Sequence, residues 1–176
     1  AQHVFNMVTI VLYRPEKPAN VGNIIRTCMA FSMNLCIIGE LSFSLSDKAF
    51  KRAEMDYCIG FDIERYDTIQ EFLLKHKEDE GYFVTRYSNK VYSSFDLKEK
   101  NKNFFFMFGR ESNGLPKELL KENIDRAMRI PMMPNCRSLN LSNTVAIVAS
   151  EFLRQNAFLS LSTKECIKGE DFLLKD

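Results

Sequence analysis

The stretch FFFMFGRESNGLP, residues 104–116, contains the most apolar run of the chain, followed by a loop with two glycines. Large apolar side chains without alternation predict a strand that is covered on both faces, at the centre of a sheet. Gly109 ends the run and Gly114 lies in the turn that follows, with Glu111 between them. The stretch therefore predicts a central strand with a polar loop at its carboxyl end.

Apolar runs of strand length alternate with segments of helical period on both sides of this strand. We expect strands at 8–13, 35–40, 58–66, 81–86, 104–109 and 127–131. We expect helices at 21–31, 46–55, 68–77, 116–122 and 140–155. This alternation predicts an α/β fold with a mostly parallel sheet and helices on both of its faces.

The composition excludes several classes of protein. A chain of 176 residues with 45% hydrophobic and 27% charged residues is typical of one soluble globular domain. No apolar run approaches the length of about 20 residues that a membrane helix needs, so we expect no membrane partner. Five cysteines without a C-x-x-C pair argue against disulfides and against zinc, so we expect no metal and a cytoplasmic location. The net charge of +1 excludes binding to nucleic acid by bulk charge.

Three loops of unusual composition follow expected strands. They are PEKPANVGNIIR at 15–26, GRESNGLP at 109–116 and PMMPNCRSLNLSN at 131–143. Ligands of open α/β sheets bind in the crevice beyond the carboxyl ends of the strands. The three loops together therefore predict a binding site at that edge of the sheet.

The first two loops each have a structural and a functional interpretation. In the first, Asn20 could cap a helix, Gly22 could permit close packing and Arg26 could be solvated, or the loop could hold a ligand. In the second, Gly109 and Gly114 could serve only the backbone. A polar Glu111 at a strand end is nonetheless a candidate for a site.

The third loop holds more short polar side chains than one helix end needs. Asn140 or Ser142 could cap the following helix, but one helix needs a single cap. The loop contains five such residues, namely Asn135, Ser138, Asn140, Ser142 and Asn143. Its backbone groups could instead bind the edge of an adenine and a ribose.

Together the loops resemble the motifs of the SpoU-type group of SPOUT methyltransferases. The motif N-x-G-x-x-x-R is present as NVGNIIR, G-x-E-x-x-G-L as GRESNGL, and I-P-M with S-L-N-L-S-N as IPMMPNCRSLNLSN. The resemblance runs from about residue 8 to 160. VLYRPEKPANVGNIIR and KRAEMDY are similar to the tRNA (cytidine/uridine-34) 2′-O-methyltransferase subgroup, the TrmL or YibK type.

The resemblance implies more than periodicity alone could suggest. It implies one SPOUT domain at 8–160, with an N-terminal extension at 1–7 and a C-terminal tail at 161–176. It also implies a C-terminal trefoil knot, which general rules of chain connection make rare. The third loop would hold S-adenosylmethionine, and a homodimer would form with help from the apolar last helix. The implied cofactor contacts are Thr85, Gly109, Ile130, Ser138 and Leu139.

The implied reaction is methyl transfer to a ribose 2′ oxygen of the wobble nucleotide 34, in the anticodon region of a tRNA. Family proposals assign proton removal to the arginine of the first motif, here Arg26. A guanidinium is always protonated, so Arg26 is better suited to hold a phosphate and to stabilise a developing alkoxide. Asn20, Glu111 and Asn140 would orient Arg26 and the ribose. RNA would meet modest basic patches formed by Arg14, Lys48, Lys51, Arg52, Arg137 and Arg154.

Other readings stay open. The same fold could methylate another tRNA position or ribosomal RNA, or serve as a catalytically silent module that binds RNA or S-adenosylmethionine. Ser32 stands where the subgroup commonly has glycine and Ser150 where it often has tyrosine, which leaves the target nucleoside open. A Rossmann enzyme using NAD would need a G-x-G-x-x-G fingerprint, which the sequence lacks.

Overall fold

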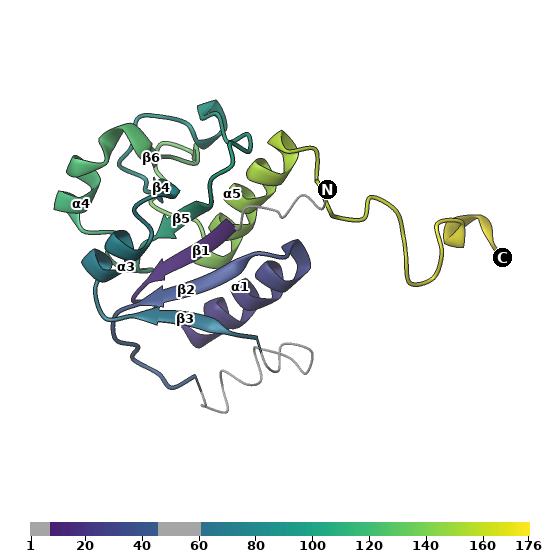
Figure 1. Cartoon of the computed structure of the whole chain (residues 1–176), viewed down its shortest axis with the longest axis horizontal. Coiled ribbons are helices and arrows are strands. Elements are labelled where there is room, and N and C mark those ends of the chain that lie inside the picture. The colour runs from purple at the N-terminus through teal and green to yellow at the C-terminus, as the bar shows by residue number, and fades with distance from the viewer. Residues whose placement is uncertain (1–7, 46–60) are drawn as a thin grey trace.

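The computed structural model describes residues 8–45 and 61–176. The expected extension at 1–7, the expected helix at 46–55 and the first residues of the strand expected at 58–66 lie outside these ranges. The described chain forms a six-stranded sheet in the order β3-β2-β1-β5-β4-β6, in which every pairing is parallel. Figure 1 shows the sheet with its helices and with the C-terminal residues extending away from it.

The elements follow the expected alternation of strands and helices. The strands are β1 (Val8–Tyr13), β2 (Asn34–Ile38), β3 (Ile63–Tyr66), β4 (Glu80–Val84), β5 (Phe104–Phe108) and β6 (Ala127–Met128). The α-helices are α1 (Pro18–Phe31), α3 (Ile69–Lys75), α4 (Lys117–Glu122) and α5 (Leu141–Gln155). Short 3₁₀ turns lie at Tyr92–Ser94, Ile124–Arg126 and Phe172–Leu174.

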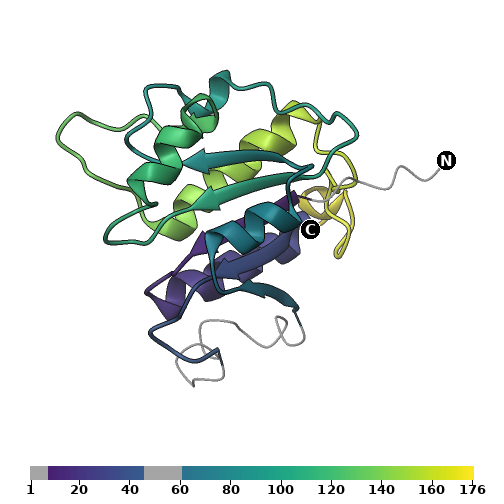
Figure 2. The ribbon, with the colours of Figure 1, turned by 60° about the vertical axis from the view of Figure 1, so that its left-hand side comes forward.

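Strand β5 lies at the centre of the sheet, as the run of apolar residues predicts. It pairs with β1 on one side and with β4 on the other, and all five of its side chains are buried. Its alternate side chains enter two separate cores, because successive side chains of a strand point to opposite faces. Phe104, Phe106 and Phe108 pack in the core that α1 and α5 cover. Phe105 and Met107 pack in the core that α3 and α4 cover, so both faces of the sheet carry helices (Figure 2).

The ends of α1 and α5 place the loops of interest. Helix α1 begins at Pro18, where proline fits because the first amides of a helix have no partner within it. It ends at Phe31, and the C-cap residue Ser32 adopts a left-handed backbone with φ of 56°. Glycine adopts that conformation without strain, and a serine there costs about 1 kcal/mol. Helix α5 begins after Asn140, whose side chain caps it.

The structure leaves other expectations as predictions. The trefoil knot and the division into 1–7, 8–160 and 161–176 remain predictions from the resemblance. Among residues 8–45 and 61–176, no helix has the length and the apolar character needed to cross a membrane. The four described cysteines are all free thiols, with Cys28 and Cys36 buried and Cys136 and Cys166 exposed.

Candidate active site

A cleft of about 580 Å³ lies beyond the carboxyl ends of β4 and β5. Its lining comes from Lys17 and Asn20, from 84–87, from 108–114 and from parts of 130–144. The three loops singled out in the sequence therefore meet in one place. The cleft brings together eight of the nine expected site residues, namely Asn20, Thr85, Gly109, Glu111, Ile130, Ser138, Leu139 and Asn140.

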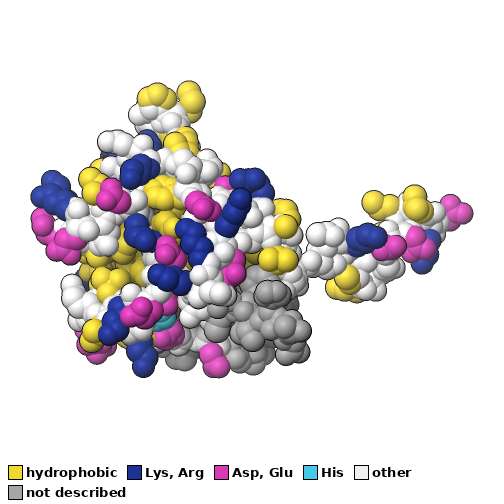
Figure 3. Space-filling model, turned by 45° about the horizontal axis from the view of Figure 1, so that its top comes forward, with side chains coloured by type: hydrophobic (Ala, Val, Ile, Leu, Met, Phe, Trp, Pro, Cys, Tyr) yellow, Lys and Arg dark blue, Asp and Glu magenta, His cyan; other side chains and the backbone are white. Residues whose placement is uncertain are grey.

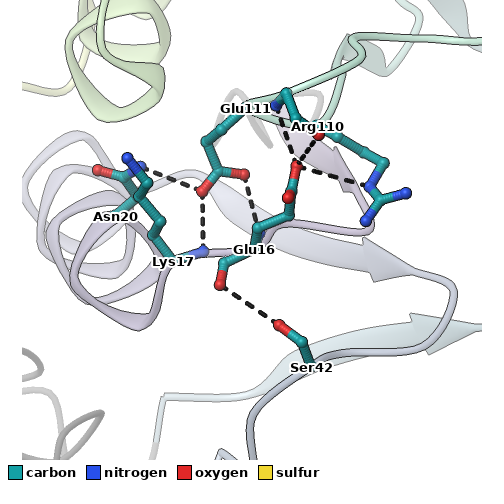
Figure 4. Close-up of polar contacts among 7 residues, drawn as sticks. Glu16, Lys17, Asn20, Ser42, Arg110 and Glu111 are labelled. Atoms are coloured by element: carbon teal, nitrogen blue, oxygen red, sulfur yellow. Dashed lines mark hydrogen bonds and ion pairs between the residues drawn. The ribbon is translucent and has the colours of Figure 1, made fainter.

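Glu111 joins the loop after β5 to the start of α1. Its carboxylate accepts hydrogen bonds from the backbone amides of Glu16 and Lys17, both at 2.8 Å, and from the side-chain amide of Asn20 at 3.2 Å (Figure 4). Lys17 is the N-cap residue of α1 and its own side chain makes no capping hydrogen bond. A negative charge near a helix N-terminus is favourable, so Glu111 stabilises the start of α1 from another part of the chain, by accepting from the two amides that precede Pro18.

Asn20 does not cap α1, because the helix begins at Pro18, two residues earlier. The capping interpretation of Asn20 is therefore wrong. Asn20 is buried and its Nδ2 donates to Glu111, while its Oδ1 accepts from Nδ2 of Asn140 at 3.1 Å. The side-chain amide of Asn20 is thus bonded to the second loop through its nitrogen and to the third loop through its oxygen.

Asn140 caps α5, which is one of the roles that the sequence left open, and it also reaches the first loop. Its Oδ1 accepts from the backbone amides of Ser142 and Asn143, at 2.9 and 3.3 Å, and so caps α5. Its Nδ2 donates to Asn20 at the same time. The side chains of Asn140, Asn20 and Glu111 therefore form one hydrogen-bonded chain that joins all three loops.

A second contact joins the first two loops, and here the carboxylate comes from the first loop and the donors come from the second. The carboxylate of Glu16 accepts from the backbone amide of Ser112 at 3.0 Å and from its hydroxyl at 2.6 Å. These bonds from Ser112, with Arg110 nearby at 3.7 Å, lower the pKa of the Glu16 carboxyl. The hydroxyl of Ser42 also donates to the carbonyl oxygen of Glu16 (Figure 4). Glu16 and Glu111 thus hold the two loops against each other reciprocally.

Similarity to known proteins identifies the family of the chain that forms this cleft. The SpoU rRNA Methylase family model matches residues 7–150. The chain belongs to this family. A relative from Geobacillus stearothermophilus, provisionally named tRNA (cytidine(34)-2′-O)-methyltransferase, is 48% identical over 87% of this chain and 98% of its own length.

Solved structures of related proteins share the SpoU-family fold. One structure, described as giving insights into the 2-OH methylation of C/U34 on tRNA, has a TM-score of 0.77. It is 33% identical, and the match covers 85% of this chain and 96% of that one. An AdoMet-bound rRNA methyltransferase from Sinorhizobium meliloti has a TM-score of 0.74 and is 27% identical, over 84% of this chain and 56% of that one.

Arg26 is the one expected site residue of the SpoU motifs that does not line the cleft. It lies on the exposed side of α1, six residues after the buried Asn20. Six residues correspond to about 240° of rotation around a helix, so the two side chains leave α1 in different directions. Within one chain, the structure therefore separates Arg26 from Asn20, Glu111 and Asn140.

The sequence reasoning missed other residues of this SpoU-family cleft. Arg86 and Tyr87 line it directly after β4, and Lys17 and Arg110 line it near α1 and β5. Only their positions in the sequence could have indicated these residues, because three of them follow the end of a buried strand and Lys17 precedes the first residue of α1. Within the described part of the chain, no group of three or more His, Cys, Asp or Glu side chains is arranged for a metal ion.

We expect Glu111→Gln to lower the free energy of unfolding by about 2 kcal/mol or more. The carboxylate accepts three hydrogen bonds, whereas a glutamine amide turns a donor toward one of these three donors. Urea unfolding measures the change. As a control, Glu118→Gln removes an exposed carboxylate paired with Lys121 and should shift stability by less than about 0.5 kcal/mol. Equal stability of both variants would show that the start of α1 does not depend on this carboxylate.

Proposed function

We propose that the chain is an S-adenosylmethionine-dependent tRNA 2′-O-ribose methyltransferase that acts on cytidine or uridine at the wobble position 34. The observation that carries this proposal is the hydrogen-bonded chain of Asn140, Asn20 and Glu111, which joins all three motifs of the family at one cleft. The target nucleotide follows from the relative named for cytidine 34 and the structure described for C/U34. Such a substrate implies a cytoplasmic protein.

The cleft fits S-adenosylmethionine in size and in chemistry. Its volume of about 580 Å³ lies within the range of small-molecule sites. Apolar side chains of Val84, Phe108 and Ile130 lie in the lining beside the polar loop at 137–140. The residues that would hold the cofactor are Thr85, Gly109, Ile130, Ser138 and Leu139. The AdoMet-bound structure at 27% identity supports this donor.

The protein has one main chemical task in this reaction. When bound, the cofactor supplies the methyl group on a sulfonium that becomes a neutral thioether, so no leaving anion needs stabilisation. The 2′ hydroxyl is a poor nucleophile until its proton leaves. A fixed positive charge beside that oxygen favours the alkoxide, and the guanidinium of Arg26 would supply that charge.

The position of Arg26 supports a homodimer. A second copy whose cleft faces the exposed side of α1 would receive Arg26 at the ribose that this cleft binds. In that arrangement, Asn20, Glu111 and Asn140 act as positioning residues, because they fix the loops of the cleft. Their hydrogen-bonded chain would hold the start of α1 and the start of α5 in register across the site.

The charges around the cleft support an RNA substrate. Lys17, Arg86, Arg110 and Arg137 all line the cleft, although the net charge of the chain is only +1. On the face shown in Figure 3, basic side chains lie among acidic ones and form no uniform positive surface. Binding should therefore depend on a few local phosphate contacts, each of which releases counterions and makes affinity depend on salt.

Ribosomal RNA is the second candidate substrate, because the structural relative from Sinorhizobium meliloti is described as an rRNA methyltransferase. The test uses labelled S-adenosylmethionine and tRNA that lacks 2′-O-methylation at position 34, followed by mapping of the labelled nucleotide. We expect label at nucleotide 34. Label at another tRNA position or only on ribosomal RNA would replace the proposed target. Cofactor binding without label on either RNA would favour the silent module.

A further inference from the structure

Tyr87 is a large aromatic side chain at the mouth of the cleft. It lines the cleft, yet 68% of its surface is exposed. Most exposed apolar residues of a protein stand alone and need no explanation. Tyr87 differs from them because its position is fixed by several contacts.

The backbone on either side of Tyr87 is anchored to the sheet. Its own amide donates to the hydroxyl of Thr85 at 3.1 Å, and the amide of Thr85 donates to the carbonyl oxygen of Met128 at 2.9 Å. The next residue, Ser88, is buried and donates from its hydroxyl to the carbonyl oxygen of Ala127 at 2.6 Å. The exposed ring therefore projects from a short segment that is tied to β6 on both sides.

The ring of Tyr87 is also held from one side by Arg86. The guanidinium carbon of Arg86 lies 4.5 Å from the ring centroid, and its Nη2 donates to the tyrosine hydroxyl at 2.8 Å. The guanidinium of Arg129 in turn donates to the carbonyl oxygen of Arg86. One face of the ring is thus covered by a cation, while most of the side chain stays open to solvent.

We propose that Tyr87 is a stacking platform for a nucleobase of the bound RNA, next to the ribose that is methylated. An aromatic ring with an open face, beside a cation that can meet a phosphate, has the two parts that bind single-stranded nucleic acid. Tyr87 lines the same cleft as Val84 and Thr85 and is more exposed than either, which leaves its ring accessible to a ligand from solvent. The proposal rests on the proposed function and adds a residue that fixes how the RNA lies.

The test measures RNA affinity apart from catalysis. The probes are a fluorescently labelled tRNA anticodon stem-loop and a single-stranded RNA of mixed sequence, each titrated in the presence of S-adenosylhomocysteine. Tyr87→Ala should raise both dissociation constants by about 5- to 100-fold, and Tyr87→Phe should stay within about threefold of wild type. The control is Leu74→Ala, which removes a side chain that is 72% exposed on α3, on the face of the sheet opposite to α1 and α5. This variant should change neither dissociation constant.

Two further measurements separate stacking from other roles. Stacking releases no counterions, so the slope of log Kd against log salt should stay unchanged in Tyr87→Ala, whereas Arg137→Ala should reduce that slope by about one. Calorimetry should give the same cofactor affinity for Tyr87→Ala as for wild type. Unchanged RNA affinity in Tyr87→Ala overturns the proposal, and so does a loss confined to cofactor affinity, which would mean that the ring covers the cofactor.

Failure of the proposed function gives a different result. If wild-type protein binds both RNA probes but leaves nucleotide 34 unlabelled, the proposed target is wrong. The stacking role of Tyr87 still holds in that case, provided that Tyr87→Ala weakens RNA binding. Wild-type protein that binds neither probe overturns both proposals together.

Discussion

Replacing Arg26 with alanine should lower the rate of methyl transfer to tRNA by about 100- to 1000-fold, the usual effect of removing one charge-stabilising donor from an active site. Cofactor affinity should stay within about twofold, because Arg26 does not line the cleft of its own chain and, in the proposed dimer, would meet the ribose and not the cofactor. Single-turnover transfer of labelled methyl measures the rate, and calorimetry measures cofactor affinity.

Arg26→Lys should also lose at least about tenfold in rate. Lysine keeps the positive charge but loses the planar fork of donors that holds a phosphate through two bonds. Lys75→Ala is the matched control, since it removes one exposed charge in the last turn of α3, on the other face of the sheet. A lysine variant with nearly full activity would show that neither phosphate binding nor alkoxide stabilisation depends on the guanidinium.

Mixing of subunits tests whether Arg26 acts across a dimer. Arg26→Ala is inactive by loss of the arginine, and Ser138→Trp should be inactive because its large side chain fills the cleft. If Arg26 serves the cleft of a second copy, reassociated mixtures should regain roughly a quarter of wild-type activity, because half of the dimers are mixed and each has one complete site. If Arg26 serves its own cleft, the mixtures stay inactive.

The central part of the fold could be predicted from the sequence because its signals are strong and local. The unbroken apolar run of β5 and the helical period of α5 both depend on burial, and each element lies within a residue or two of its predicted position. The predicted bounds of strands at the edge of the sheet were less accurate. The strand expected at 127–131 pairs with β4 only at Ala127–Met128, and Arg129 forms an isolated parallel bridge with Val91. The extent of an edge strand depends on its single partner, which its own side chains do not reveal.

The assembly of the site required information that local patterns do not contain. Glu111 accepts hydrogen bonds from the amides just before a helix that begins more than 90 residues earlier in the chain, and no propensity of either segment predicts that contact. Pattern reasoning offered Asn20 as the cap and placed the start of α1 at residue 21, three residues after its actual start at Pro18. The family resemblance placed eight residues at the cleft, because motifs preserve such long-range contacts. It did not indicate Tyr87, which belongs to none of the three motifs.

Gly109→Ala should give the largest loss of stability among single methyl additions in this site. A Cβ at Gly109 would lie 2.1 Å from the carbonyl carbon of Gly114 and 2.4 Å from the amide nitrogen of Leu115. These are backbone atoms, which cannot rotate away as a side chain can. Reciprocal hydrogen bonds between the backbones of Arg110 and Gly114, at 3.0 and 3.2 Å, hold the loop closed at this point.

We expect Gly109→Ala to lower the free energy of unfolding by about 3 kcal/mol or more, and to weaken cofactor binding by more than about 100-fold. Gly114→Ala is the matched control within the same loop. A Cβ there meets nothing within 4 Å, and its only cost is the left-handed backbone with φ of 65°, about 1 kcal/mol. Urea unfolding and calorimetry compare the two. Similar losses in both variants would show that the loop opens easily, so that the close approach of Gly109 to Gly114 does not shape the cleft.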